Sequence, residues 1–234
     1  MEYNRPMATR RSYGSYDDGC AAAHALDVVG ERWALLVVRE LILGPKRFTD
    51  IRAGVPGASA NLLSQRLREL EEAGVLQRRT LGPPSGANVY ELTEWGLGLE
   101  TVLQALGRWG AQSPAMPHGA SIGTDTMILA LRTMFDPEAA RGIDVTLEFR
   151  FGRDRFRGRA ADGEMLLERG SAKDAAAIVT TEASTLTHIV FHGRSLDEAI
   201  AAGEVRVEGD RGALQRFLAI FPSLGAVGEA GVAS

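Results

Sequence analysis

The sequence of 234 residues lacks the features that define several large classes of protein. It has one cysteine, Cys20, so no disulfide can form within the chain and nothing indicates secretion. No apolar run approaches the roughly 20 residues that a membrane helix needs. The N-terminal stretch MEYNRPMATRRSYGSYDDG lacks the apolar core of a signal peptide. We therefore expect a cytoplasmic protein without a membrane partner.

Residues that carry catalytic or metal chemistry are also scarce. Four histidines and one cysteine form no convincing set of nucleophile and base. His188 and His192 have a spacing that can bind zinc on a helix, but no cysteine is near and no glutamate lies between them as in a metalloprotease helix. The GPPSG stretch is too short for a phosphate-binding loop and lacks the following lysine. We expect no enzyme, no metal and no cofactor.

Charge is unevenly distributed along the chain. The net charge of −4 would not by itself indicate nucleic-acid binding. Between Lys46 and Arg79, however, seven basic residues stand against four acidic ones. Such a local basic patch is what binding to a phosphate backbone requires.

Composition divides the chain into two predicted domains. Residues 113–121, SPAMPHGAS, combine two prolines with small residues, as linkers do. The predicted organisation is a flexible arm over 1–18, a first domain over 19–112, a linker over 113–121, a second domain over 122–222 and a flexible tail over 223–234.

Residues 59–74, SANLLSQRLRELEEAG, predict a helix with two unlike faces. At 100° per residue, its apolar side chains cluster on one side, at Leu62, Leu63, Leu67, Leu70 and Ala73. The opposite side bears Asn61, Ser64, Gln65 and Arg68. Ser59 is expected to cap the helix and Gly74 to end it. Arg66 falls with the leucines, where we expect it to snorkel or to pair with a glutamate.

The elements around this helix predict a winged helix-turn-helix. Helices are expected between Cys20 and Leu43 and over the RFTDIRAGV stretch. Two strands, at 75–81 and 87–92, flank the tight GPPSG connection, and Thr93 is expected to cap a last helix that runs to Trp109. In this fold a helix enters the major groove, where amides and guanidinium groups bind base edges. The alternative is that the polar face is merely solvated.

The same segments resemble the HxlR family of bacterial winged-helix transcriptional regulators. The resemblance covers about Cys20 to Gly110 and rests on ALDVVGERWALLVVRELILGPKRFTDI, SANLLSQRLRELEEAGVLQRR and YELTEWGLGLETVLQALGRWG. It implies a homodimer that binds double-stranded operator DNA, with dimerisation through the N-terminal helix and the helix at 93–109. It also implies groove contacts by Ser59, Asn61, Ser64, Gln65 and Arg68. Backbone contacts are then expected from the basic and loop residues Lys46, Arg47, Arg78, Arg79, Ser85 and Asn88.

Cys20 lies where many members of this family have a cysteine, near the start of the first helix, and some of them sense oxidants or electrophiles through it. A reactive thiol needs a lowered pKa, which a helix N-terminus supplies and which Asp17 and Asp18 oppose. The alternative is a small residue packed at a dimer interface.

The second domain predicts an α+β fold. A helix is expected over residues 125–136, and IDVTLEFRF alternates so that Glu148 points away from the buried side. Asp162 and Gly163 predict a hairpin turn. Further strands and helices follow, so one face of an antiparallel sheet should be covered by helices. The arginines between Arg150 and Arg159 fit a solvated strand face better than a site for an acidic partner.

This second domain resembles the sterol carrier protein family over residues 122–222. The resemblance rests on DVTLEFRFG, RFRGRAADGEMLLERG and AAIVTTEASTLTHIVFHGRSLDEAIAAGEVRVEGDRGALQRFLAIF. It implies a cavity for a lipid-like or other small hydrophobic ligand and no catalytic residues. The candidate lining residues are Met127, Leu131, Phe135, Phe149, Phe151, Phe156, Ile189, Phe191, Phe217 and Phe221. Each of them is equally compatible with plain core packing.

Together these patterns predict a homodimeric transcriptional regulator that responds to a small hydrophobic effector. One alternative is a redox- or electrophile-sensing regulator that uses Cys20, with a structural second domain. Another is a lipid carrier.

Overall fold

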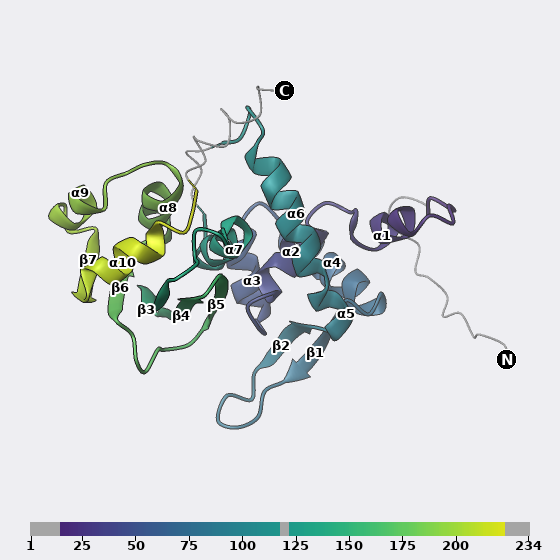
Figure 1. The fold of residues 1–234 in the computed structure, drawn as a ribbon. Helices are drawn as coiled ribbons and strands as arrows, with labels where there is room; N and C mark the ends of the chain where they lie inside the picture. Colours follow the sequence, from purple (N-terminus) through teal and green to yellow (C-terminus); the bar gives the residue numbers. More distant parts are fainter. Residues whose placement is uncertain (1–14, 118–121, 223–234) are drawn as a thin grey trace, which may run out of the picture. The chain divides into compact units, whose positions relative to one another are not determined.

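The computed structural model describes residues 15–117 and 122–222, which form two compact units (Figure 1). The first unit contains the described residues up to Leu41 and Pro45–Leu97. The second contains Ile42–Gly44 and the described residues from Gly98 onward. The predicted tail, most of the predicted arm and part of the predicted linker lie outside the described residues.

The first unit is a set of helices followed by a two-stranded hairpin (Figure 1). In chain order its elements are α1 (Ala21–Val29), α2 (Ala34–Leu41), α3 (Phe48–Gly54), α4 (Ala60–Glu72), β1 (Leu76–Thr80), β2 (Asn88–Leu92) and α5 (Glu94–Leu97). Helix α2 supplies the centre of the core, because its apolar side chains meet α3, α4 and β2. The fully buried residues include Val37, Val38, Leu41, Ile51, Leu63, Leu67 and Leu70.

The ends of α4 and α5 follow the predicted capping chemistry. Ser59 Oγ accepts a hydrogen bond from the amide of Leu62, 3.3 Å away, which satisfies an amide that has no partner within the helix. Gly74 has φ of 76°, the left-handed conformation that ends a helix and that favours glycine. Thr93 Oγ1 accepts from the amide of Gly96, 3.1 Å away. The predicted caps are confirmed.

The helix predicted from Thr93 to Trp109 is wrong in its continuity. The structure has α5, then Gly98, then α6 (Leu99–Ala111). Gly96 lets α5 approach the strand region closely, because a Cβ there would clash with the carbonyl oxygen of Val75. By its contacts α6 belongs to the second unit, where it packs on α7 (Thr124–Met134).

The second unit is a five-stranded sheet with helices packed on it (Figure 1). After α6 and α7 its elements are β3 (Asp144–Phe151), β4 (Asp154–Ala161), β5 (Glu164–Arg169), β6 (Ala177–Thr181), α8 (Ala183–Phe191), α9 (Leu196–Ala201), β7 (Val205–Gly209) and α10 (Arg211–Leu218). The α+β class is confirmed, whereas the expectation of an antiparallel sheet is wrong. The strand order is β5-β4-β3-β6-β7, and β3 pairs with β6 in parallel.

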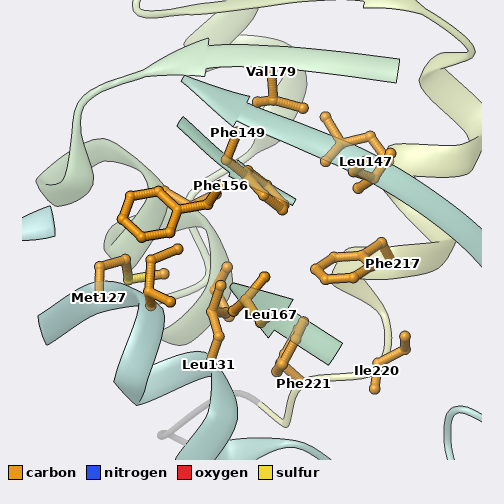
Figure 2. Packing of buried hydrophobic residues seen from close by; sticks show 14 of the residues in the cluster. Met127, Leu131, Leu147, Phe149, Phe156, Leu167, Val179, Phe217, Ile220 and Phe221 are labelled. Carbon is orange, nitrogen blue, oxygen red and sulfur yellow. The ribbon is translucent and has the colours of Figure 1, made fainter. Parts of the chain in front are cut away.

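The core of the second unit is rich in aromatic rings. Phe149 on β3 lies 5.5 Å from Phe217 on α10, measured between ring centroids, and the two neighbouring rings are tilted by 53° (Figure 2). Gly158 on β4 leaves room for them, because a Cβ there would lie 3.2 Å from Phe149 and 3.3 Å from Phe217. Met127 and Leu131 of α7 complete the cluster from the helix layer (Figure 2).

Glu148 differs from the predicted solvent-facing residue, because its side chain is buried. Its two carboxylate oxygens accept hydrogen bonds from Arg150 Nε at 2.6 Å and from the amide of Ala172 at 2.9 Å. The connection between β5 and β6 therefore covers this face of β3. The alternating pattern of a strand cannot predict that a distant segment buries one of its polar residues.

Candidate functional site

The predicted recognition helix, α4, presents a polar face opposite its buried leucines. Asn61 and Arg68 are exposed, whereas Ser64 and Gln65 are half-buried. Within the described chain, no hydrogen bond or ion pair holds the Asn61 or Arg68 side chain. These two groups are therefore available to a ligand that offers acceptors or negative charge.

Three side chains of α4 form a connected network beside this face. Gln65 Nε2 donates to Glu69 Oε1 at 3.0 Å, and Arg66 pairs with Glu69 Oε2. Arg66 also lies 3.5 Å from Glu31 Oε2, in the connection between α1 and α2. The expectation that Arg66 pairs with a glutamate is confirmed. Glu69 and Glu31 were missed from the sequence as site residues, although the spacing of Gln65, Arg66 and Glu69 places them side by side on a helix.

The hairpin places two further candidate cations at the surface. Arg78 and Arg79 are both about half-exposed. Arg78 pairs with Glu71 at 3.1 Å and lies over the ring of Tyr90, while Arg79 pairs with Glu91 at 2.8 Å. The Arg78–Glu71 pair is the more exposed of the two, since the Glu91 side chain is only 18% exposed. Exposed pairs contribute little to stability, so a phosphate can replace Glu71 as the partner of Arg78 at small cost.

Three other residues predicted to contact the DNA backbone form two side-chain pairs at the surface. Arg47 Nη2 donates to Ser85 Oγ at 3.3 Å, so the start of α3 and the tip of the hairpin lie together. Asn88 Oδ1 accepts from Thr80 Oγ1 at 2.9 Å across the hairpin. Both pairs are exposed and open to solvent.

Lys46 lies in a different environment from the other candidates. Its Nζ donates to the buried Glu40 at 2.7 Å, and its backbone pairs with Tyr90 of β2. Glu40 also pairs with Arg39 at 2.9 Å. Lys46 therefore connects α2 to the hairpin through Glu40 and Tyr90. Because a buried carboxylate without its cation is strongly unfavourable, we expect Lys46 to stabilise the first unit.

Cys20 is exposed at the N-cap position of α1. The backbone amides of Ala23 and then Ala22 lower the pKa of its thiol, because amides in the first turn of a helix stabilise the negative thiolate. Asp18, which the sequence predicts to oppose thiolate formation, accepts a hydrogen bond at its Oδ1 from the amide of Cys20, 2.9 Å away. The helix start thus favours the reactive form of the thiol.

The structure brings all ten candidate ligand-lining residues into one hydrophobic cluster or against it. Eight are buried in the cluster, while Phe135 and Ile189 are partly buried at its edge. Five of the aromatic members form a chain of ring contacts at centroid distances between 5.5 and 6.3 Å, namely Phe149, Phe151, Phe156, Phe217 and Phe221. In the structure these side chains are packed as a core.

A helical core with a capped, polar-faced helix and a basic hairpin beside it defines a DNA-binding protein of the helix-turn-helix class. Comparison with known proteins agrees. The sequence profile of the HxlR-like helix-turn-helix family matches residues 28–116, and the chain belongs to this family. Its relatives are transcriptional regulators, and transcription regulation through DNA binding is the function of the class.

The relatives include two regulators from Bacillus subtilis (strain 168). The HTH-type transcriptional regulator YvaP is 35% identical over 88 residues, which cover 38% of this chain and 82% of YvaP. The HTH-type transcriptional regulator YodB is 36% identical over 88 residues, which cover 38% of this chain and 79% of YodB.

Solved structures show the same partial coverage. Quinone-bound YodB from B. subtilis is 34% identical, with a TM-score of 0.35, over 39% of this chain and 97% of that one. The redox regulator HypR in its oxidised form is 31% identical, with a TM-score of 0.39, over 42% of this chain and 100% of that one.

A second profile, described as the alkyl sulfatase C-terminal domain, matches residues 120–224. The second unit is therefore similar to the alkyl sulfatase C-terminal family, whereas its sequence pattern predicts the sterol carrier protein family. No helix in the described part of the chain is long and apolar enough to cross a membrane.

Proposed function

We propose that the chain is a homodimeric regulator that inserts α4 into the major groove of operator DNA and lays the β1–β2 hairpin on the backbone. The observation that carries this proposal is the available polar face of α4, where Asn61 and Arg68 are exposed beside Gln65. An amide can bind the edge of adenine and a guanidinium the edge of guanine. Arg78 and Arg79 supply charge for the phosphates next to the groove.

This proposal is tested by selecting operator sequences from a random double-stranded DNA library with the wild-type protein. Gln65→Ala and Arg68→Ala should each weaken binding to the selected sequence by about 1–3 kcal/mol and relax the preference at one base pair. Arg141→Ala, which removes an exposed arginine of the second unit, is the matched control. Wild-type affinity in both α4 variants would contradict the proposal and favour a lipid carrier.

The second unit is, in this proposal, an effector domain of the sterol carrier protein type that binds a small apolar molecule. Support comes from its aromatic cluster and from the position of α7 between that cluster and α6. Met127 and Leu131 of α7 lie in the core. Arg132, on the same helix, donates from Nε to the Leu167 carbonyl at 2.9 Å and from Nη1 to Glu100 of α6 at 2.7 Å.

A ligand that displaces core side chains would thus shift α7 and, through Arg132, α6. The effect on DNA requires a ligand with different affinities for the DNA-competent and incompetent states. Native mass spectrometry of the purified protein, followed by denaturing extraction, should release an apolar molecule. Operator affinity that stays unchanged with every ligand that binds would contradict this part of the proposal.

A thiol-sensing regulator is the second candidate function, favoured by the exposed Cys20 thiol with its lowered pKa. Solved relatives include a quinone-bound YodB and a redox regulator, HypR. Alkylation by N-ethylmaleimide, in which the thiolate adds to the double bond to form a thioether, should proceed at a lower pH than with free cysteine. Cys20→Ser should abolish the response of DNA binding to electrophiles if this thiol is the sensor. The same variant should keep the response of DNA binding to an apolar ligand if the effector domain is the sensor.

A further inference from the structure

We infer that Glu69 is a positioning residue that holds Gln65 in the orientation needed to bind one particular base, and that Arg66 and Glu31 hold Glu69 in turn. This inference rests on the proposed binding of α4 in the major groove. It assigns a role in sequence recognition to three residues that need not touch DNA themselves.

The orientation of the Gln65 amide follows from the chemistry of its partner. A carboxylate only accepts hydrogen bonds, so the NH₂ group of Gln65, and not its oxygen, must face Glu69 Oε1 at 3.0 Å. One N–H is used in this contact. The second N–H and Oε1 remain, and together they form the donor and acceptor pair that matches N7 and N6 of adenine.

Glu69 is itself fixed by a buried cation. Its other oxygen, Oε2, pairs with Arg66, whose side chain is only 5% exposed. Arg66 reaches Glu31 on its other side at 3.5 Å. Because the guanidinium is rigid and buried, the carboxylate between it and Gln65 has little freedom to rotate.

Arg66 also reduces the electrostatic repulsion between Glu69 and the DNA phosphates. A carboxylate on a helix in the major groove repels the phosphates on either side. The buried guanidinium is shared with Glu31 but lies against Glu69 and offsets part of its charge, so Glu69 can orient Gln65 with less repulsion of the DNA. A preorganised side chain also loses less rotamer entropy on binding than a free glutamine.

The test is a double-mutant cycle measured as base discrimination. The wild-type protein first selects its operator from a random double-stranded library, and Gln65→Ala then identifies the base pair that depends on Gln65. At that base pair we expect Glu69→Ala to lose most of a preference of about 5- to 150-fold, while preferences elsewhere in the operator stay as in the wild type. The double variant Gln65→Ala/Glu69→Ala should lose nothing further there.

Discrimination is a ratio of affinities measured on one protein sample, so partial unfolding of a variant cancels from it. Glu72→Ala, which removes the same charge from the same helix, is the matched control and should keep the preference at the Gln65 base pair. The inference is overturned if Glu69→Ala leaves that preference intact, or if it changes the affinity for all sequences equally. It is also overturned if Gln65→Ala affects no base pair. A wild-type protein that selects no sequence would instead refute the proposed function.

Discussion

At the scale of single residues, the buried acids of this chain are held by opposite charge, and Glu148 shows the consequence for pH. Burial raises the pKa of its carboxyl, but hydrogen bonds from Arg150 and from the Ala172 amide, with the charges of Arg150 and Arg155, lower it by more. The pKa in the folded protein is therefore below its ordinary value of 4.5. The stabilisation is present above the unfolded-state pKa and is lost as the pH falls through the folded-state pKa.

We therefore expect Glu148→Gln to lower the free energy of unfolding at neutral pH by about 1–3 kcal/mol, the range for hydrogen bonds to a charged group. The difference from the wild type should shrink in acid, because protonation removes the same charge from Glu148. Urea unfolding followed by circular dichroism over a pH series measures this convergence. Glu168→Gln, on the exposed pair with Arg157, is the control and should change little. A constant difference at all pH values would contradict the assignment.

At the scale of elements, the second unit depends on close packing between β4 and α10. A Cβ at Gly158 would lie 2.9 Å from Leu167 as well as close to Phe149 and Phe217. We expect Gly158→Ala to lower the free energy of unfolding by about 1–3 kcal/mol, as overpacking does. Gly123→Ala, at the N-cap of α7, where nothing lies within 4 Å of the added methyl group, should cost only about 0.5 kcal/mol, the difference between glycine and alanine as an N-cap. Equal stability of the two variants would show that the rings near Gly158 can move aside.

The elements also show which parts of the structure are local enough to be predicted from sequence. Ser59, Gly74 and Thr93 act on neighbours a few residues away, so their capping roles follow from chemistry and spacing alone. The predicted hairpin turn at Asp162 and Gly163 is equally local, and both residues have the positive φ that such a turn requires.

Contacts between distant segments could not be predicted in this way. The parallel pairing of β3 with β6 depends on which strands meet after about 30 residues of chain, and strand alternation does not encode that. Arg132 donates to the Leu167 carbonyl, 35 residues away in the sequence. Lys46 pairs with the buried Glu40 only once α2 and the hairpin have packed together. At the candidate site, the polar face of α4 was predictable, whereas the connection from Glu69 through Arg66 to Glu31 required the fold.

At the scale of the whole molecule, the apolar stripe on α6 bears on assembly. Glu100 and Gly107 face α7, and the opposite side carries Val102, Leu106 and Trp109, which are 49%, 46% and 74% exposed. Exposed apolar patches of this kind usually mark a protein interface. The proposed dimer would bury this stripe and set the spacing of the two recognition helices, which must meet major grooves about 34 Å apart.

We expect Leu106→Glu to make the protein monomeric, because a charge in a dry interface without a partner is strongly unfavourable. Sedimentation velocity measures the oligomeric state, and fluorescence anisotropy measures binding to operators with one and with two half-sites. The variant should lose about 100-fold or more in affinity for the two-site operator, because it loses the effective concentration that a linked second module provides. Its affinity for one half-site should stay close to that of the wild type, since α4 is unchanged.

Thr101→Glu places the same charge on an exposed part of α6 outside the stripe, so it should remain dimeric and bind the two-site operator as the wild type does. A dimeric Leu106→Glu protein would exclude the stripe as the interface. A monomeric variant that keeps full affinity for the two-site operator would show that recognition does not depend on dimerisation. Either result would also remove the route by which α7 and Arg132 are proposed to carry an effector signal to DNA, because that route acts through the placement of α6.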